Sequence, residues 1–261
     1  MNTQRLRPIE ISENEFKHIG HQLIDDIAEL NNSMSERSLT LGKTPEDIQS
    51  LLGERNFPLN GESPSELMSR TTELLINNSL FNGHPKFMGY ITASAAPIGA
   101  LGDLLASTVN PNCGAFTLSP MATEIEKQTI QWLAEFIGVS PSYGGILVSG
   151  GNMANFTAFL AARTAKAPSN FKEDGFMSSP RKMIVYCSKT THTWIEKAAI
   201  LFGHGTKAVR WIKTDCQNKM DLIALENAIK SDLEKGHQPF IVAGTAGDVS
   251  TGAVDDLQGI A

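Results

Sequence analysis

His192 is the first residue whose type and position could support chemistry. It follows the apolar run RKMIVYCS (181–188), which predicts a buried strand, and precedes a predicted helix that begins at Thr193. Thr193 and Glu196 have the T-x-x-E spacing of a capping box, so the imidazole of His192 is expected to point off the helix tip. The carboxyl end of a strand is where α/β proteins bind ligands. The position is compatible with a ligand contact and equally with a solvated loop histidine.

A pair of glycines supplies the second candidate. Gly150 and Gly151, followed by Asn152, lie between a predicted strand, GGILVS (144–149), and the start of a predicted helix, NMANFTAFLAARTAKA (152–167). The unpaired N–H groups and positive dipole at a helix start attract phosphate, and glycine lets the backbone approach it closely. The sequence at this turn matches neither of the two standard nucleotide-binding motifs, G-x-G-x-x-G and G-x-x-x-x-G-K-[ST]. The turn therefore predicts either a phosphate site or a tight turn without a ligand.

A third polar loop follows the predicted strand PFIVAGTAG (239–247). Thr245, Asp248, Ser250 and Thr251 crowd hydroxyls and a carboxylate at this strand end. Such a loop either contributes to a site or only caps the next helix.

The three loops are expected to meet at one edge of a sheet. The carboxyl ends of parallel strands share an edge, so Gly151, His192 and Thr245 should lie along it. A phosphate seat, a flat imidazole and a hydroxyl-bearing loop together suit a phosphorylated aromatic ring. This combination indicates pyridoxal 5'-phosphate.

Alternating strand and helix patterns from about residue 84 onward position these loops. Strands spaced by helical segments predict βαβ units and a mostly parallel sheet. The final VDDLQGIA (254–261) predicts the first turns of another helix, so we expect this α/β part to be incomplete. The remaining predicted elements are a helix at 119–138 stopped by Gly138, strands at 182–188, 207–213 and 239–247, and helices at 193–203 and 220–236.

Residues 1–83 differ in character and predict a helical arm. Apolar residues recur at helical spacing at Phe16, Ile19, Leu23 and Ile27, and proline stands just inside two further helix starts. Three amphipathic helices cannot bury their apolar stripes alone. The arm should therefore pack on another domain or on a partner subunit.

Bulk properties exclude several functional classes. The net charge of −6 and the absence of a long basic run disfavour nucleic-acid and anionic-membrane surfaces. The N-terminus is no secretory signal, and the most apolar stretch (91–109) is interrupted by Pro97 and Asp103. Three cysteines without regular spacing indicate neither a disulfide framework nor a metal site. We expect a cytoplasmic protein.

Several ordered segments make the chain resemble the group II pyridoxal-phosphate decarboxylases, which act on aromatic amino acids, glutamate, histidine and related substrates. The similarity covers roughly residues 60–261, and the helical arm also fits. The segments are HPKFMGYITASAAPIGALGDLL, SPMATEIEKQTIQWLAEFIG, GGILVSGGNMANFTAFLAAR, THTWIEKAA and AGTAGDVSTGAVDDL.

The resemblance implies a role for individual residues. His192 would stack on the pyridine ring near the substrate carboxylate, as the catalytic histidine. Asn152 and Met153, after Gly151, would offer backbone N–H groups to the phosphate. Thr92 would reach the cofactor region, in some members from the neighbouring subunit, and Thr245 would lie near the ring.

Two departures from the family pattern stand out. Asp248 lies where relatives often have G-T-x-N-T-G or G-T-T, and its charge would oppose a phosphorylated cofactor unless it faces away. The family's aspartate partner of the ring nitrogen and its cofactor-binding lysine have no counterpart here. Lys189 is expected to be a solvated charge rather than a substitute, and we expect the chain alone to be inactive.

The resemblance implies an N-terminal helical arm (1–83) and a partial cofactor-binding domain (84–261) of the three-layer α/β/α aspartate-aminotransferase type. The complete protein would remove the α-carboxylate of an L-amino acid and form a homodimer through the arm. The alternatives are another pyridoxal-phosphate lyase of this fold, such as a sphingosine-phosphate lyase or cysteine desulfurase, and a truncated pairing subunit without activity. A dinucleotide-binding module ranks third, because its fingerprint is missing.

Overall fold

The computed structural model describes residues 10–53, 56–58, 60–179 and 181–261. It contains two compact units, one ending at Val109 and the other running from Asn110 to Ala261. This division lies later in the chain than the expected one at residues 83 and 84, which remains a prediction about the domains of the complete protein. Residues 1–9 of the expected arm lie outside the described residues.

The first unit contains four α-helices among its described residues. Ser12 begins the first helix by accepting a hydrogen bond from the Glu15 N–H at 3.2 Å. Thr44 and Asp47 form a reciprocal capping box at the second, where proline occupies the first turn as predicted. The helices are α1 (Glu13–Ser33), α2 (Pro45–Leu51), α3 (Pro64–Asn78) and α4 (Pro97–Val109), with a short 3-10 helix, η1 (Met34–Glu36), after α1.

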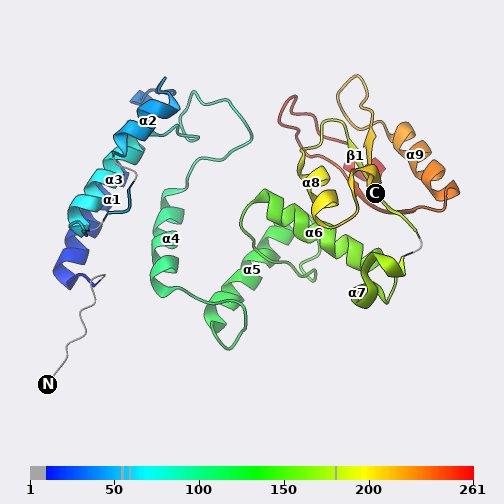
Figure 1. Cartoon of the computed structure of the whole chain (residues 1–261), viewed down its shortest axis with the longest axis horizontal. Coiled ribbons are helices and arrows are strands. Elements are labelled where there is room, and N and C mark those ends of the chain that lie inside the picture. The colour runs from blue at the N-terminus through cyan, green and yellow to red at the C-terminus, as the bar shows by residue number, and fades with distance from the viewer. Residues whose placement is uncertain (1–9, 54–55, 59, 180) are drawn as a thin grey trace. The chain divides into compact units, whose positions relative to one another are not determined.

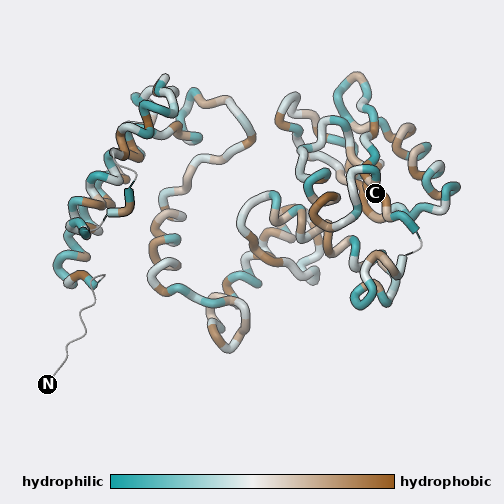
Figure 2. Tube along the Cα trace, in the orientation of Figure 1, coloured by the Kyte–Doolittle hydropathy of each residue, from teal (hydrophilic) through white to brown (hydrophobic). Residues whose placement is uncertain are grey.

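The apolar stripe of α1 is only partly buried in this unit. α1 packs against α3 and buries Ile19, whereas Phe16 on the same stripe stays 57% exposed. Figure 2 shows hydrophobic and hydrophilic residues alternating along these helices, as expected of amphipathic segments. The partial burial leaves room for a further packing partner on this stripe.

The second unit is built on a three-stranded parallel sheet with the strand order β2-β1-β3. Figure 1 shows β1 between α8 and α9. The larger elements are α5 (Pro120–Phe136), α6 (Gly151–Lys166), β1 (Met183–Ser188), α8 (Trp194–Leu201), β2 (Val209–Ile212), α9 (Leu222–Glu234) and β3 (Gln238–Ala243). The shorter ones are α7 (Phe171–Asp174), η2 (Gly175–Ser178), η3 (Thr206–Ala208) and α10 (Leu257–Ile260).

The central strand β1 is buried along its whole length, as its continuous apolar sequence predicts. Because side chains alternate across a strand, its residues feed two separate cores. Met183, Val185 and Cys187 pack with α6 and α8, while Ile184 and Tyr186 pack with residues of α9 and α10. The result is the predicted helix–sheet–helix layering in a partial α/β fold.

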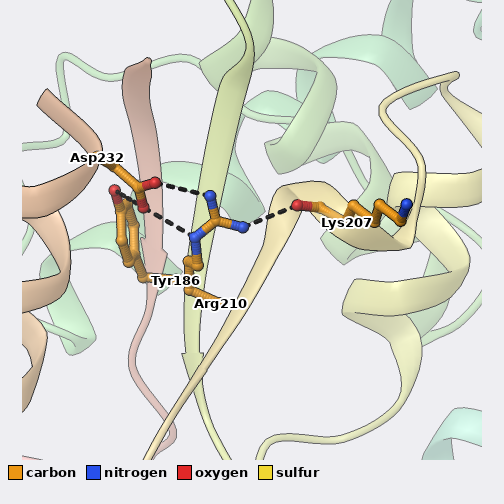
Figure 3. A network of polar contacts seen from close by, with 4 residues as sticks. All are labelled: Tyr186, Lys207, Arg210 and Asp232. Atoms are coloured by element: carbon orange, nitrogen blue, oxygen red, sulfur yellow. Dashed lines mark hydrogen bonds and ion pairs between the residues drawn. The ribbon is translucent and has the colours of Figure 1, made fainter. Parts of the chain in front are cut away.

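A polar network lies inside the core on the α9 side (Figure 3). Asp232 of α9 is 2% exposed and accepts hydrogen bonds from Arg210 Nε at 2.9 Å and Nη2 at 2.6 Å. It also accepts the hydroxyl of buried Tyr186 at 3.0 Å, and Arg210 Nη1 donates to the Lys207 carbonyl at 2.7 Å. Burial alone would raise the pKa of Asp232, but the bonds from Arg210 and Tyr186 outweigh it and lower that pKa.

One predicted strand is wrong. Residues 144–149 form no strand in the structure, although the segment is apolar enough to be one. A strand requires a hydrogen-bonded neighbour, and the Leu147 N–H is bonded instead to the Glu126 carboxylate of α5 at 2.9 Å. The segment still leads into α6, so the predicted turn at its end is retained.

The helix predicted over 119–138 is confirmed as α5. It ends as expected, with Gly138 at a φ of +76° directly after the helix cap at Ile137. Its apolar stripe, however, is not buried within this unit, since Ile125 and Leu133 remain exposed.

His204 makes the stability of this unit pH-dependent. Its ring lies against Phe159, Phe176 and Phe240, and burial, with the charge of Arg163, lowers its pKa from 6.5 to about 4. The unfolded chain therefore binds more protons between these values, so stability is full above pH 6.5 and falls as the pH drops toward 4. Such a shift corresponds to roughly 3 kcal/mol for a fully buried ring, and partial exposure reduces it to about 1–2 kcal/mol.

We expect His204→Phe to flatten this dependence. Urea unfolding midpoints of the wild type and the variant, measured at pH 7 and pH 4.5, test the prediction. An equal loss of stability in both proteins would show that other groups cause it.

Candidate functional site

The carboxyl ends of β1 and β3 and the start of α6 enclose a cavity of about 720 Å³. Small-molecule sites commonly have volumes of about 300–1,000 Å³, so the cavity could hold a cofactor-sized ligand. It is lined by Ser149, Gly150, Gly151, Asn152, Asn155, Thr191, His192, Trp194, Ala243, Gly244, Thr245 and Ala246.

The glycine turn forms one wall of the cavity. Gly150 adopts a φ of +88°, a conformation that favours glycine, and accepts the first hydrogen bond of α6 from the Ala154 N–H at 3.1 Å. The N–H groups of the first turn of α6 therefore have no acceptor within the helix. A Cβ added at Gly151 would meet no atom within 4 Å, so the space beside this turn is open. This is the geometry of an anion seat at a helix N-terminus.

His192 lines the cavity from the loop after β1. Its Nδ1 accepts a hydrogen bond from the Trp194 N–H at 3.2 Å, which fixes the ring beside the start of α8. A neutral ring with Nδ1 as acceptor carries its proton on Nε2, leaving that atom as a donor.

The predicted capping box at α8 is wrong. Thr193 is the N-cap residue, but its side chain makes no capping bond. Its backbone is already helical, with φ −61° and ψ −4°, whereas a capping side chain normally comes from an extended residue. The His192 ring instead satisfies a backbone N–H of the first turn.

Thr245 reaches the cavity from the loop after β3. Its N–H donates to Asp255 Oδ2 at 2.8 Å, and its hydroxyl lies 3.3 Å from the hydroxyl of Thr191. The backbone of Thr245 is therefore held by Asp255, and its side chain contacts the loop that carries His192.

Asp248 is not part of the cavity lining. Its buried carboxylate accepts the N–H groups of Ser250 at 2.9 Å and Thr251 at 3.0 Å, as well as the Thr251 hydroxyl. The Thr251 hydroxyl is the largest cause that lowers the pKa of Asp248. The carboxylate thus organises its own turn.

The structure brings together most of the predicted site residues. Gly151, Asn152, His192 and Thr245 all line the cavity. Met153 lies in the same first turn of α6 but is not part of the lining, and Thr92 belongs to the other unit. Lys189 is exposed and outside the lining, in agreement with a solvated charge.

The lining residues that the sequence analysis did not name include Asn155, Thr191 and Trp194. Asn155 could have been found, because it stands one helical turn beyond Gly151 and so shares its face. Thr191 and Trp194 flank His192, but nothing in their spacing distinguishes them from other loop residues.

The described residues contain no cluster of histidine, cysteine and acidic side chains able to hold a metal ion. Among the helices in the described part of the chain, none combines the length and apolarity needed to cross a membrane.

Comparison with known proteins identifies the family to which the chain belongs. The model of the pyridoxal-dependent decarboxylase conserved domain matches residues 45–261, and the chain belongs to that family. The family confirms the resemblance inferred from the sequence and names its cofactor.

Two relatives that match the chain are named for different amino-acid substrates. The chain is 30% identical over 253 residues to an aromatic-L-amino-acid decarboxylase of Bacillus atrophaeus, covering 97% of this chain and 51% of the relative. It is 29% identical to the human cysteine sulfinic acid decarboxylase, covering 92% and 47%. The chain therefore spans about half the length of these relatives.

Solved structures share the fold. The 4-hydroxyphenylacetaldehyde synthase of Rhodiola rosea matches with a TM-score of 0.84 and 27% identity, over 97% of this chain and 54% of that one. Mouse CSAD matches with a TM-score of 0.81 and 25% identity, over 94% and 52%.

The residues at the cavity fit pyridoxal 5'-phosphate. Open space lies beside Gly151 at the helix start, whose unpaired N–H groups suit a phosphate, and His192 and Thr245 line the same cavity. Asp248, the one acidic residue of concern, is turned into its own loop.

Proposed function

We propose that this chain contributes the phosphate-binding and ring-binding part of a pyridoxal 5'-phosphate-dependent enzyme that removes the α-carboxylate of an L-amino acid. The observation that carries the proposal is the convergence of the α6 N-terminus, His192 and Thr245 on one cavity. Family membership supports the same class of reaction.

The chain's own residues have separate tasks in this proposal. The first turn of α6, at Gly151, Asn152 and Met153, binds the phosphate through backbone N–H groups and the helix dipole. His192 lies against the ring, with its orientation set by the Trp194 N–H. Thr245 supplies a hydroxyl after the neighbouring strand β3, and Thr92 is a further proposed contact.

The cofactor, when bound, supplies an electron-accepting ring that makes loss of the carboxylate feasible. The protein's part is to bind and orient. With Nδ1 occupied by the Trp194 N–H, His192 presents Nε2–H, a donor suited to a substrate carboxylate in the cavity.

Binding of the cofactor tests the phosphate seat. We expect Gly151→Glu to weaken retention of pyridoxal 5'-phosphate by at least about tenfold, because a carboxylate would then stand beside the phosphate. The side chain has open space and the backbone is unstrained, so the effect would be electrostatic rather than a folding defect. Visible absorbance during dialysis provides the measurement.

Gly102→Glu is the matched control, since Gly102 is also a helical glycine with open space around it but lies in α4. Equal cofactor retention in the Gly151 variant, the Gly102 variant and the wild type would remove Gly151 from the site.

The substrate is proposed only as an L-amino acid. Matched relatives are named for aromatic amino acids and cysteine sulfinic acid, and one is named for an aldehyde product. Assays of the complete protein with aromatic and acidic L-amino acids, measuring carbon dioxide together with amine or aldehyde, would identify both substrate and outcome. Absence of carbon dioxide release from every one of them would reject the proposed reaction.

We also propose that the complete protein is cytoplasmic and forms a homodimer through the arm. The dimer contact is supported by Phe16, which stays exposed on the apolar stripe of α1. Phe16→Glu is expected to shift the complete protein toward monomer in sedimentation experiments, whereas Gln22→Glu, at an exposed polar position of α1, should not. A well-folded wild-type monomer at micromolar concentration would contradict this assembly.

A further inference from the structure

Thr191 links the two strand-end loops that line the cavity after β1 and β3. It is buried, and its hydroxyl oxygen accepts the Ser188 N–H at 3.1 Å, at the end of β1. The same oxygen lies 3.3 Å from the hydroxyl of Thr245, which is 54 residues further along the chain. A single hydroxyl thus joins the loop of His192 to the loop of Thr245.

Asp255 holds the other side of Thr245. Its buried carboxylate accepts the Thr245 N–H at 2.8 Å and the Met220 N–H at 2.7 Å, and its own N–H donates to the Thr245 carbonyl at 2.9 Å. Because its backbone is bonded in both directions, Thr245 can shift only if this clamp opens. The remaining freedom of its hydroxyl is set by Thr191.

From this connection we propose that Thr191 is a positioning residue for the pyridoxal site. It acts through its hydroxyl, which fixes the spacing between the His192 loop and Thr245. The proposal rests on the proposed function, because that spacing matters only if a ligand bridges the two loops. A substrate or cofactor group in the cavity would then meet two preorganised partners rather than two independent loops.

The neighbouring Thr190 shows why the connection is specific. Its hydroxyl lies 3.0 Å from the Ser188 hydroxyl and is on the same turn as Thr191. No hydrogen bond from its side chain to the Thr245 loop is present in the described structure. Thr190→Val is therefore a matched control for the loss of a β-branched hydroxyl at this turn.

The experiment compares Thr191→Val, Thr191→Ser and Thr190→Val. Valine keeps the shape of threonine but cannot accept the Ser188 N–H or bond to Thr245, whereas serine can do both. We expect Thr191→Val to weaken binding of pyridoxal 5'-phosphate by about tenfold, the size expected for loss of a buried hydrogen bond. Thr191→Ser should restore it, and Thr190→Val should stay near the wild type.

Amide hydrogen exchange provides a second readout that does not need the cofactor. The Trp194 N–H, bonded to the His192 ring, should exchange faster in Thr191→Val and not in Thr191→Ser. Circular dichroism checks that each variant folds, and Thr191→Ser keeps the test usable if the valine variant does not.

The outcomes separate this inference from the proposed function. If wild-type protein fails to bind the cofactor, the proposed function fails, and unchanged Trp194 exchange in Thr191→Val then overturns the positioning role as well. If the wild type binds and Thr191→Val binds equally well with unchanged exchange, only the positioning role is overturned. Weaker binding by Thr190→Val to the same degree would also reject it, since the effect would not depend on Thr245.

Discussion

We expect Asp232→Ala to lower the free energy of unfolding of the α/β unit by about 3–5 kcal/mol, the effect typical of removing one partner of a buried ion pair. The change leaves the guanidinium of Arg210 and the hydroxyl of Tyr186 without the carboxylate that accepts them. Both lie where little water can replace it, since Tyr186 is fully buried and Arg210 is largely covered. Urea unfolding at pH 7 provides the measurement.

Glu226→Ala serves as the control on the same helix. Glu226 is exposed and forms a surface ion pair with Lys230 one turn away, so its removal should leave the unfolding midpoint close to the wild type. The unfolding midpoint of Asp232→Asn should lie between those of Asp232→Ala and Glu226→Ala, because the amide oxygen can still accept one of the hydrogen bonds. Equal midpoints for Asp232→Ala and Glu226→Ala would show that the network contributes no net stability.

Phe159→Ala is expected to destabilise the same unit by about 3–5 kcal/mol through the cavity it leaves. Phe159 is 0% exposed, and its ring contacts those of Phe202, His204 and Phe240 between α6 and the sheet. Phe159→Leu should cause a smaller loss, because most of the volume is retained. The unfolding midpoint again measures the effect.

Phe136→Ala is the control for this substitution. Phe136 ends α5 and is 88% exposed, so little packing is lost when it is truncated. If Phe159→Ala were no more destabilising than Phe136→Ala, α6 would not be packed against the sheet as the structure shows.

The sequence was sufficient to predict the strand whose residues are all buried. The apolar run ending at Ser188 predicted β1 correctly, and the placement of His192 and Thr245 after parallel strands predicted their convergence. These conclusions depend on local pattern and on a general rule of parallel sheets.

Features that depend on a distant partner were not predictable in the same way. Residues 144–149 have a strand-like composition, but pairing requires a neighbour that composition does not reveal. The Tyr186–Asp232 bond joins residues 46 positions apart, and nothing in the helical pattern of α9 marks Asp232 as buried. The capping box failed for a different reason, since backbone dihedral angles at Thr193 decide which side chain can reach the helix end.

The strand order has a consequence for how the site forms during folding. β1 and β2 are connected through α8, whereas pairing of β1 with β3 also encloses β2 and α9. Closing the longer loop carries the larger entropic cost, so we expect β3 to dock after β2. Because Thr245 follows β3, the cavity exists only after this late step. A ligand of the cavity would bind only after β3 has docked on the sheet. Its binding would therefore report that folding of this unit is complete.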